Sequence, residues 1–366
     1  MSLKKDRNNS FDNKFMRFAI NLAMNQRGLT GTNPSVGCVI VKDKKIISYG
    51  ATSLNGRPHA ETIALKKCKN KSLESTIYVT LEPCSHHGKT PPCTNSIIKS
   101  KVKKVYYSIE DSDLRSFNNS KKILTSKKII VKSGLLQSDT KKFYKNYDYI
   151  RKHKMPYVTG KLACSSNFYI LKNKKPITNE HSRKVSHLLR YHNQGILTSY
   201  KTINSDNPKL NCRIKGLEEF SPTRLIIDKN LKIKINTYII NNSNKYNTII
   251  FHSSLNTKKI NYLKYKKVKL IYLKLNNYGY IDLKTIFKKI YNLGIHNLLV
   301  ECGSILTNNI LKEKLFNEFY LFKSSKKLIN RNKINVKNIK KNLNITFKSK
   351  KRVNTYLDKD SLLHYY

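Results

Sequence analysis

Three side chains of types that bind zinc stand in two short segments of the sequence. His59 is followed two residues later by Glu61, and Cys84 and Cys93 flank a stretch that begins after Pro83. One imidazole and two thiolates supply three ligands for a tetrahedral Zn²⁺ and leave the fourth position open to water, as in catalytic zinc sites. Zinc lowers the pKa of such a water toward about 7, and Glu61 is placed to move protons there. The pattern therefore predicts a hydrolytic zinc centre.

The spacing of the two cysteines bears on which class of zinc enzyme the centre belongs to. H-x-E followed by P-C-x-x-C is typical of zinc nucleobase deaminases, whereas eight residues separate Cys84 from Cys93 here. A histidine near a helix start, or two cysteines in a loop, is by itself more often structural than catalytic. The combination of His-x-Glu at a helix start with Pro-Cys after a strand favours a catalytic zinc.

Alternating strands and helices are expected to position these residues. Helical spacing over 14–29 and an apolar hairpin pattern over 36–49 precede the histidine. The remaining expected elements are a helix over 60–70, a buried strand over 76–81, a Gly/Pro-rich loop over 83–92, a helix over 94–100 and strands over 102–109 and 129–135. Alternation of this kind indicates an α/β domain.

A second α/β pattern begins after a charged and aromatic stretch at 141–155. We place the domain boundary there, which gives domains of residues 1–150 and 151–366. Strands are expected at 157–164, 195–199, 224–228, 247–251, 268–273, 297–301 and 317–322. The Lys/Asn-rich stretches 229–247 and 323–351 are expected to contain expanded loops.

Composition excludes several classes of protein. The 366 residues are 39% hydrophobic, which is too apolar for a disordered chain. No apolar run approaches the roughly 18 residues that span a bilayer, and the polar N-terminal segment has no apolar signal region. Seven cysteines, an odd number, do not indicate a disulfide framework. We therefore expect a cytoplasmic protein with no membrane partner.

The net charge of +50 invites a nucleic-acid interpretation. However, the 72 basic residues are 60 lysines and 12 arginines, spread along the whole length together with abundant Asn, Ile and Tyr. A nucleic-acid surface is expected to gather arginines for bidentate contacts. The uniform enrichment favours compositional bias over a specific nucleic-acid partner.

Three segments resemble the deaminase half of the bifunctional riboflavin biosynthesis family: TNPSVGCVIV at 32–41, PHAE at 58–61 and YVTLEPCSHHGKTPPC at 78–93. The long insert between the cysteines separates this pattern from tRNA adenosine and cytidine deaminases. The resemblance implies a cytidine-deaminase-like α/β/α domain that removes an amino group from a diaminopyrimidinone ribosylamino 5′-phosphate. The implied residues are His59, Cys84 and Cys93 for zinc, Glu61 as proton donor, and Asn33, His86, His87 and Lys89 for substrate or phosphate.

Residues 156–320 resemble the second half of the same family, a dihydrofolate-reductase-like domain that uses NADPH to reduce a ribosyl group to ribityl. The clearest stretches are GILTS at 195–199, DNPKLNCR at 206–213 and VECGSIL at 300–306. No G-x-G-x-x-G follows the first strand, so a Rossmann domain is not supported. Substrate contacts are implied for Arg190, Leu210, Arg213 and Glu301, and NADPH contacts for Ala163, Thr202, Asp206, Gly303 and Ser304. Guanidinium groups suit a phosphate, and a helix start suits a pyrophosphate.

Two segments of this second half depart from the family pattern. SSNFY at 165–169 stands where the family usually has Ser-x-Asp-Gly-Arg/Lys, and KKPIT at 174–178 stands where it has Ser-x-Trp-Ile-Thr. Phe168 lacks the backbone freedom of glycine, and Pro176 takes the place of an aromatic cofactor contact. We expect an enzyme, a homo-oligomer acting on a small pyrimidine nucleotide, that retains deamination while its reduction is weak, altered or lost.

Two alternatives stay open at this point. A tRNA or nucleic-acid base deaminase would share the zinc chemistry, but the long cysteine spacing and the reductase-like half speak against it. A binding protein with a structural zinc would use the basic surface, but Glu61 and a set of only three ligands speak against that.

Overall fold

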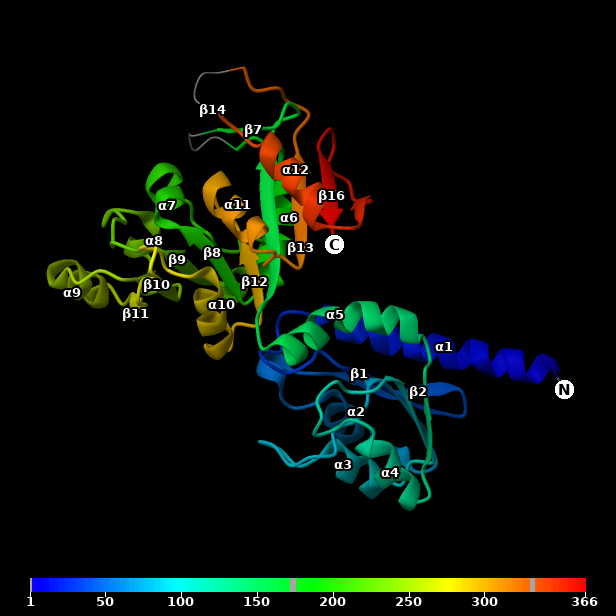
Figure 1. The fold of residues 1–366 in the computed structure, drawn as a ribbon. Coiled ribbons are helices and arrows are strands. Elements are labelled where there is room, and N and C mark those ends of the chain that lie inside the picture. Colours follow the sequence, from blue (N-terminus) through cyan, green and yellow to red (C-terminus); the bar gives the residue numbers. More distant parts are fainter. Residues whose placement is uncertain (1, 172–175, 330–332) are drawn as a thin grey trace. The chain divides into compact units, whose positions relative to one another are not determined.

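The computed structural model describes residues 2–171, 176–329 and 333–366, which fold as two compact units, 1–154 and 155–366 (Figure 1). Each unit has its own sheet and core. Within the described residues, no helix combines the length and apolar character needed to cross a bilayer.

The N-terminal unit is built on a mixed sheet. Its strands are Gly37–Lys42 (β1), Lys45–Ala51 (β2), Thr76–Leu81 (β3), Lys104–Ile109 (β4) and Ile130–Ser133 (β5). Its helices are Ser2–Asn25 (α1), Ala60–Cys68 (α2), Cys93–Lys99 (α3), Asn119–Ser126 (α4) and Gln137–His153 (α5), with 3₁₀ turns at Leu54–Gly56 (η1) and Lys69–Ser72 (η2). The described strands run in the order β2-β1-β3-β4-β5, antiparallel from β2 to β3 and parallel from β3 to β5.

Helices cover both faces of this sheet, with α1 and α5 on one face and α2, α3 and α4 on the other (Figure 1). Successive strand residues point to opposite faces, so Cys38 and Ile40 of β1 pack with α2 whereas Val39 and Val41 pack with α1. Burial on both faces explains why the strands read as continuous apolar runs in the sequence.

The C-terminal unit has a larger sheet. Its strands are Tyr157–Cys164 (β6), Tyr169–Leu171 (β7), Gly195–Ser199 (β8), Thr223–Ile227 (β9), Thr248–His252 (β10), Lys269–Tyr272 (β11), Asn297–Val300 (β12), Glu318–Lys323 (β13), Lys333–Asn335 (β14), Lys350–Arg352 (β15) and Ser361–Tyr365 (β16). Its helices are Glu180–Tyr191 (α6), Tyr200–Asp206 (α7), Tyr238–Asn241 (α8), Thr257–Tyr265 (α9), Leu283–Asn292 (α10), Ser304–Lys312 (α11) and Lys337–Thr346 (α12), with a 3₁₀ turn at Glu218–Phe220 (η3). Over the described residues, nine strands pair in the order β11-β10-β9-β8-β12-β6-β13-β16-β15, parallel as far as β13, while β14 and β7 form a separate ribbon.

Two apolar cores flank the larger sheet. Helices α10, α11 and α12 contribute to one core, and α7, α8 and α9 contribute to the other. Phe287 and Ile290 of α10 are fully buried in the first core, as are Ile239 and Ile240 of α8 in the second.

The α/β architecture and the expected strands are confirmed, and three connecting segments contain helices that the sequence analysis did not predict. The charged stretch 141–155 lies mostly within α5, whose Tyr144 is buried against the sheet. The stretch 229–247 contains loops, as expected, together with the short helix α8 and the buried Leu231. The described part of 323–351 likewise contains loops together with α12, whose Leu343 is buried. Apolar residues at helical spacing decided these structures despite the polar composition around them.

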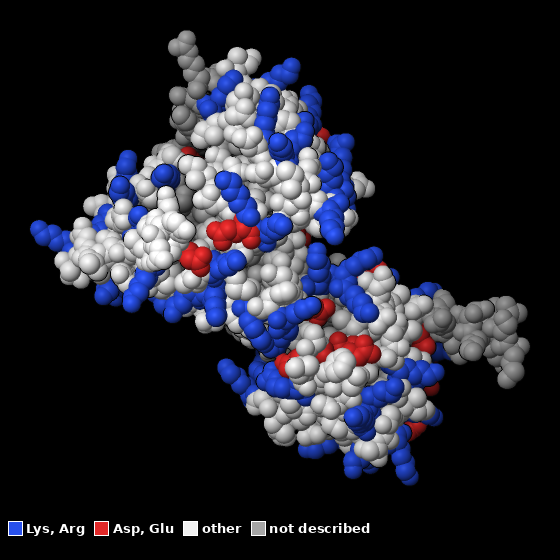
Figure 2. All heavy atoms as spheres, viewed as in Figure 1, with Lys and Arg blue, Asp and Glu red and all other residues white. Residues whose placement is uncertain are grey.

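Basic side chains are spread over the visible face of each unit and do not gather in one patch (Figure 2). This distribution matches the even spread of lysine along the sequence. A specific nucleic-acid surface would be a concentrated basic patch, so the visible face favours compositional bias.

Candidate functional site

The three predicted zinc ligands converge at one end of the N-terminal sheet. His59 immediately precedes α2, Cys84 follows β3, and Cys93 is the first residue of α3. Their ligand atoms all lie within 4.8 Å of one another. His59 Nδ1 is 3.6 Å from Cys84 Sγ and 3.3 Å from Cys93 Sγ.

These separations fit a single tetrahedral ion. Zinc–nitrogen and zinc–sulfur bond lengths place neighbouring N and S ligands about 3.5 Å apart in a tetrahedron. The Cys84 thiol is also readily ionised, because hydrogen bonds with Cys93 and then His59 lower its pKa. The donor set of one imidazole and two sulfurs therefore suits zinc and leaves one ligand position for a substrate or water.

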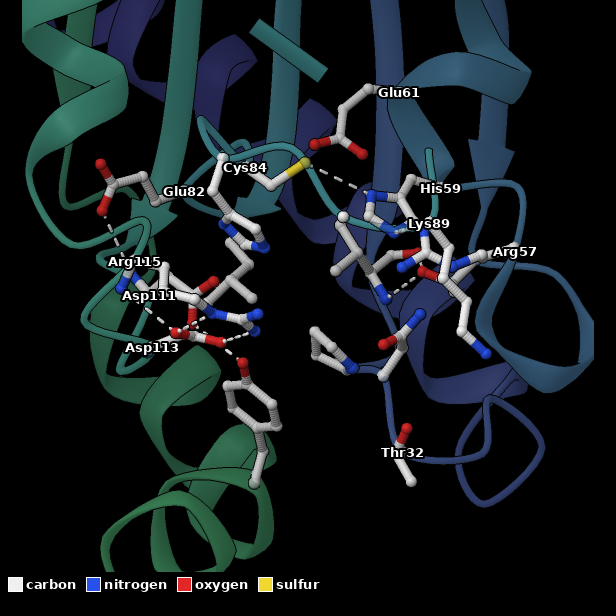
Figure 3. A pocket seen from close by; sticks show the side chains of 18 of the residues that line it. Thr32, Arg57, His59, Glu61, Glu82, Cys84, Lys89, Asp111, Asp113 and Arg115 are labelled. Carbon is white, nitrogen blue, oxygen red and sulfur yellow. Dashed lines mark hydrogen bonds and ion pairs between the residues drawn. The ribbon is translucent and has the colours of Figure 1, made fainter. Parts of the chain in front are cut away.

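Glu61 lies beside the ligands in the first turn of α2 and is only 4% exposed. Burial, followed by the negative charge of Cys84, raises the pKa of Glu61 to about 7. A carboxyl group with a pKa near the working pH can both accept and donate a proton. Glu61 lines the same cavity as His59 and Cys84 (Figure 3).

This cavity has a volume of about 400 Å³ and two polar walls. Arg57 and Lys89 lie on one wall, and Asp111, Asp113 and Arg115 lie on the other (Figure 3). Among the residues implied as substrate contacts, the cavity lining includes Asn33, His86 and Lys89. His87 is exposed and is not part of that lining.

A second cavity, of about 650 Å³, lies in the C-terminal unit. It is lined by all nine residues implied as reductase contacts: Ala163, Arg190, Thr202, Asp206, Leu210, Arg213, Glu301, Gly303 and Ser304. The parallel strands β8 and β12 are neighbours, and the segments after their carboxyl ends contribute Thr202 and Gly303. Ligands commonly bind at such strand ends in parallel sheets.

The charged residues of this second cavity pair with one another. Arg190 donates from Nε and Nη2 to the two oxygens of Glu301, at 2.8 and 2.9 Å, and from Nη1 to the Asn211 carbonyl. Burial alone would raise the pKa of Glu301, but the charges of Arg190 and Lys161 lower it to about 2. Both partners of the Arg190–Glu301 pair are thus already engaged before any substrate binds, whereas Arg213 donates to the neutral Asn211 side chain.

Of the two departures from the family pattern, the second contributes Pro176 to the lining of this cavity, whereas the first, at 165–169, precedes the lining residues Ile170 and Leu171. Phe168 adopts a φ of 61°, a left-handed conformation that glycine takes freely and a bulky residue takes at a cost of about 1–2 kcal/mol. Its ring lies under Lys323 and Lys340. Pro176 lines the cavity, and residues 174 and 175 lie outside the described residues.

The structure adds lining residues that sequence analysis did not single out as contacts. Glu82 and Asp111 follow the carboxyl ends of the adjacent parallel strands β3 and β4, a position that would have marked them. In the second cavity, His187 and Lys161 face Arg190. Apart from lying in segments that resemble the family, neither residue had a sequence feature that marked it as a contact.

Comparison with known proteins agrees with both sites. Residues 9–109 match the cytidine and deoxycytidylate deaminase zinc-binding region, and residues 168–351 match the RibD C-terminal domain. The chain is 34% identical to the riboflavin biosynthesis protein RibD of Aquifex aeolicus over 319 residues, which cover 85% of this chain and 86% of that protein. The chain belongs to the RibD family. It is also 29% identical to the RibD of Escherichia coli over 87% of this chain and 88% of that protein.

Solved RibD structures show the same fold. A RibD of Acinetobacter baumannii superimposes with a TM-score of 0.82 at 26% identity and covers 98% of this chain and 99% of its own. A diaminohydroxyphosphoribosylaminopyrimidine deaminase/5-amino-6-(5-phosphoribosylamino)uracil reductase from Thermotoga maritima does so with a TM-score of 0.81 at 28% identity, with the same coverage.

The resemblance inferred from the sequence is therefore confirmed. The chain is a RibD-family enzyme of riboflavin biosynthesis, with a zinc-dependent deaminase domain followed by an NADPH-dependent reductase domain. The match extends over both halves, which a tRNA deaminase would not explain.

Proposed function

We propose that the N-terminal unit hydrolyses the amino group of a diaminopyrimidinone ribosylamino 5′-phosphate, with His59, Cys84 and Cys93 as zinc ligands. The observation that carries this proposal is the convergence of the three ligand atoms within 4.8 Å beside the buried Glu61. Zinc held there would supply an activated water.

The protein's own residues perform the proton transfers and the orientation. Glu61 accepts a proton from the attacking water and delivers it to a ring nitrogen, and it then transfers the proton of the newly added hydroxyl group to the departing amino group. The new C–O bond replaces the C–N bond, and ammonia leaves. Arg57 and Lys89 are the cationic residues of one cavity wall, and they suit the 5′-phosphate.

For the C-terminal unit, we propose that Arg213 and Leu210 contact the substrate while Thr202, Asp206, Ala163, Gly303 and Ser304 contact NADPH. Hydride for the reduction comes from the cofactor. The Arg190–Glu301 pair frames the substrate side of the cavity. The left-handed backbone at Phe168 and the presence of Pro176 in the cavity lining support a reduction that is slower than deamination.

Ammonia release by zinc-loaded protein tests the deaminase assignment. The wild type should release one ammonia for each diaminopyrimidinone nucleotide consumed, with no requirement for NADPH. An RNA hairpin should give none. Release from the hairpin and not from the free nucleotide would instead support a nucleic-acid base deaminase.

Three further features belong to the same proposal. The enzyme works in the cytoplasm as a homo-oligomer on small molecules, without a specific nucleic-acid partner. The domain boundary lies at the end of α5, close to residue 150. Cross-linking at micromolar concentration checks the oligomer, and limited proteolysis after His153 checks the boundary.

A further inference from the structure

Glu82 is a buried carboxylate that the proposed chemistry does not use. It directly follows β3, two residues before Cys84, and is 2% exposed. Burying a carboxylate is costly unless it is well hydrogen-bonded. The hydrogen-bond partners of Glu82 therefore indicate the role of this side chain.

Within the described residues, the hydrogen bonds to this carboxylate come from one segment, 111–120, which we call the wall segment. The backbone N–H of Asp111 lies 3.3 Å and that of Asn118 3.1 Å from Oε2. Ser120 donates to Oε1 from its backbone N–H at 3.2 Å and from Oγ at 2.9 Å. Figure 3 shows the Glu82 side chain directed toward this segment, away from Glu61.

The wall segment forms the side of the deaminase cavity that carries Asp111, Asp113 and Arg115. It connects β4 to α4 and contains turns and bends but no strand, so no sheet ladder fixes it. Contacts within the segment and with α5 orient its side chains. Asp113 donates its N–H to Asp111 Oδ1 at 2.9 Å, and Arg115 Nε donates to Asp113 Oδ1 at 2.9 Å. From α5, the Tyr147 hydroxyl donates to Asp111 Oδ1 at 3.0 Å, and Arg151 Nη2 lies 3.2 Å from Asp113 Oδ2. Glu82 supplies the attachment of this internally ordered segment to the sheet.

A second attachment comes from the insert between the two cysteines. His86 Nδ1 lies 3.0 Å from Ser116 Oγ, and Ser85 Oγ donates to the Arg115 carbonyl at 3.5 Å. Cys84 is therefore flanked on both sides by residues that hold the wall segment. The same stretch of chain, 82–86, therefore carries one of the metal ligands and fixes the position of the opposite wall of the cavity.

A simple capping role does not account for these contacts. The bonds from Ser120 would suffice to cap α4, whose first residue is Asn119. Glu82 additionally accepts the N–H of Asp111, seven residues before Asn118 in the sequence, and so spans the full length of the wall segment.

We propose that Glu82 is a positioning residue for deamination: it holds the wall segment so that Asp111 and Asp113 face the pyrimidine opposite the zinc ligands. Carboxylates accept hydrogen bonds from exocyclic amino groups and ring N–H groups, which an aminopyrimidine presents. The identity of this substrate rests on the proposed function, whereas the attachment of the wall segment does not.

The test compares Glu82→Gln with Ser120→Ala and with a control, Glu74→Gln, whose carboxylate is on the surface of the same unit. The amide introduced by Glu82→Gln is isosteric with the carboxylate, but its NH₂ replaces one acceptor oxygen and faces backbone donors. Loss of hydrogen bonds to a charged group should accelerate amide exchange across 111–120 by about 10-fold or more. The amides of β3 and β4 and the zinc content should remain at wild-type levels.

Kinetics supply the second measurement. In Glu82→Gln, KM for the diaminopyrimidinone nucleotide should rise about 10-fold while kcat changes less. Ser120→Ala should show the same pattern more weakly, and it decides the question if Glu82→Gln does not fold. Glu74→Gln should behave as wild type.

Unchanged exchange in 111–120, or an unchanged KM, would overturn the proposal. So would loss of zinc together with loss of protection throughout β3 and β4, because Glu82 would then support the whole domain. If the wild type released no ammonia, the proposed function would fail, and amide exchange alone would still decide the role of Glu82.

Discussion

The two cavities of this protein differ in what their side chains are free to do. In the N-terminal unit, an imidazole and two thiols converge within 4.8 Å, and the buried Glu61, which lines the same cavity, has a pKa raised to about 7. In the C-terminal unit, the strongest charges neutralise each other, because Glu301 is bound by Arg190 at both oxygens.

The difference reflects the source of the chemistry. Deamination depends on protein groups that bind the zinc for the attacking water and transfer protons, so each of them must be held in a fixed position. Reduction depends on a hydride that NADPH supplies, so the protein mainly frames the cofactor and substrate. We therefore expect the departures at Phe168 and Pro176 to slow the reduction without abolishing the fold of the reductase domain.

The largest effect should come from Glu61→Gln. The amide cannot exchange protons, so the deamination rate should fall by about 10³-fold. Zinc content and NADPH oxidation on the deaminated intermediate should stay at wild-type levels. Steady-state ammonia release measures the deamination rate. Metal analysis measures the zinc content, and absorbance at 340 nm measures NADPH oxidation. A loss below tenfold would remove Glu61 from the proton path.

Glu301→Gln should have the next largest effect. It leaves the buried Arg190 and Lys161 without their counter-charge, which costs about 3–5 kcal/mol of folding free energy. Denaturant unfolding followed by amide exchange in β12 measures the loss. The control is Glu180→Gln, an exposed ion pair on α6, which should change little. Deamination should persist in both variants.

The sign of the pH dependence follows from the same pair. The pKa of Glu301 is lowered to about 2, so its contribution to stability is complete above the unfolded value of about 4.3 and is lost as the pH falls toward 2. Glu301→Gln should lack this acid-dependent loss. Equal acid sensitivity of the two proteins would show that the pair does not stabilise the fold.

Arg213→Ala should have an intermediate effect on reduction. Arg213 lines the cavity and is bonded to the neutral Asn211 side chain, so its guanidinium is available to a phosphate. Loss of a charge-assisted contact should raise KM for the deaminated nucleotide about 10- to 100-fold. Arg352→Ala, on the exposed strand β15, serves as control. Equal KM values in both variants would exclude Arg213 as a substrate contact.

Pro176→Trp should have the smallest effect. It restores the aromatic side chain that the family usually has at the cavity rim. Aromatic stacking is worth about 0.5–1.5 kcal/mol, so KM for NADPH should fall about 2- to 10-fold. Deamination in the same preparation provides the control. A rise in KM would show that the rim has adapted to proline.

The convergence of His59, Cys84 and Cys93 could be predicted from the sequence because its determinants are local. His59 and Glu61 are two residues apart at a helix start, and Cys84 and Cys93 flank one loop, so motif and geometry nearly coincide. The strands were also predictable, since burial on both faces leaves apolar runs such as VGCVIV at 36–41.

Other features depended on contacts distant in sequence. The Arg190–Glu301 pair joins residues 111 positions apart, and the hydrogen bonds that Ser120 donates to Glu82 span 38 positions. Neither pairing leaves a periodic signal. Helices α5 and α12 were missed as elements because lysine and asparagine on their exposed faces masked a narrow apolar stripe around Tyr144 and Leu343.

The most direct test of the difference between the two cavities is to follow both reactions in one sample of zinc-loaded wild-type protein. Diaminopyrimidinone nucleotide and NADPH are supplied together, and ammonia, NADPH and both pyrimidine products are resolved over time. Ammonia release should outpace NADPH oxidation, so that the deaminated ribosyl intermediate accumulates before the ribityl product forms. NADPH oxidation that keeps pace with ammonia release, with no intermediate detected, would contradict the account.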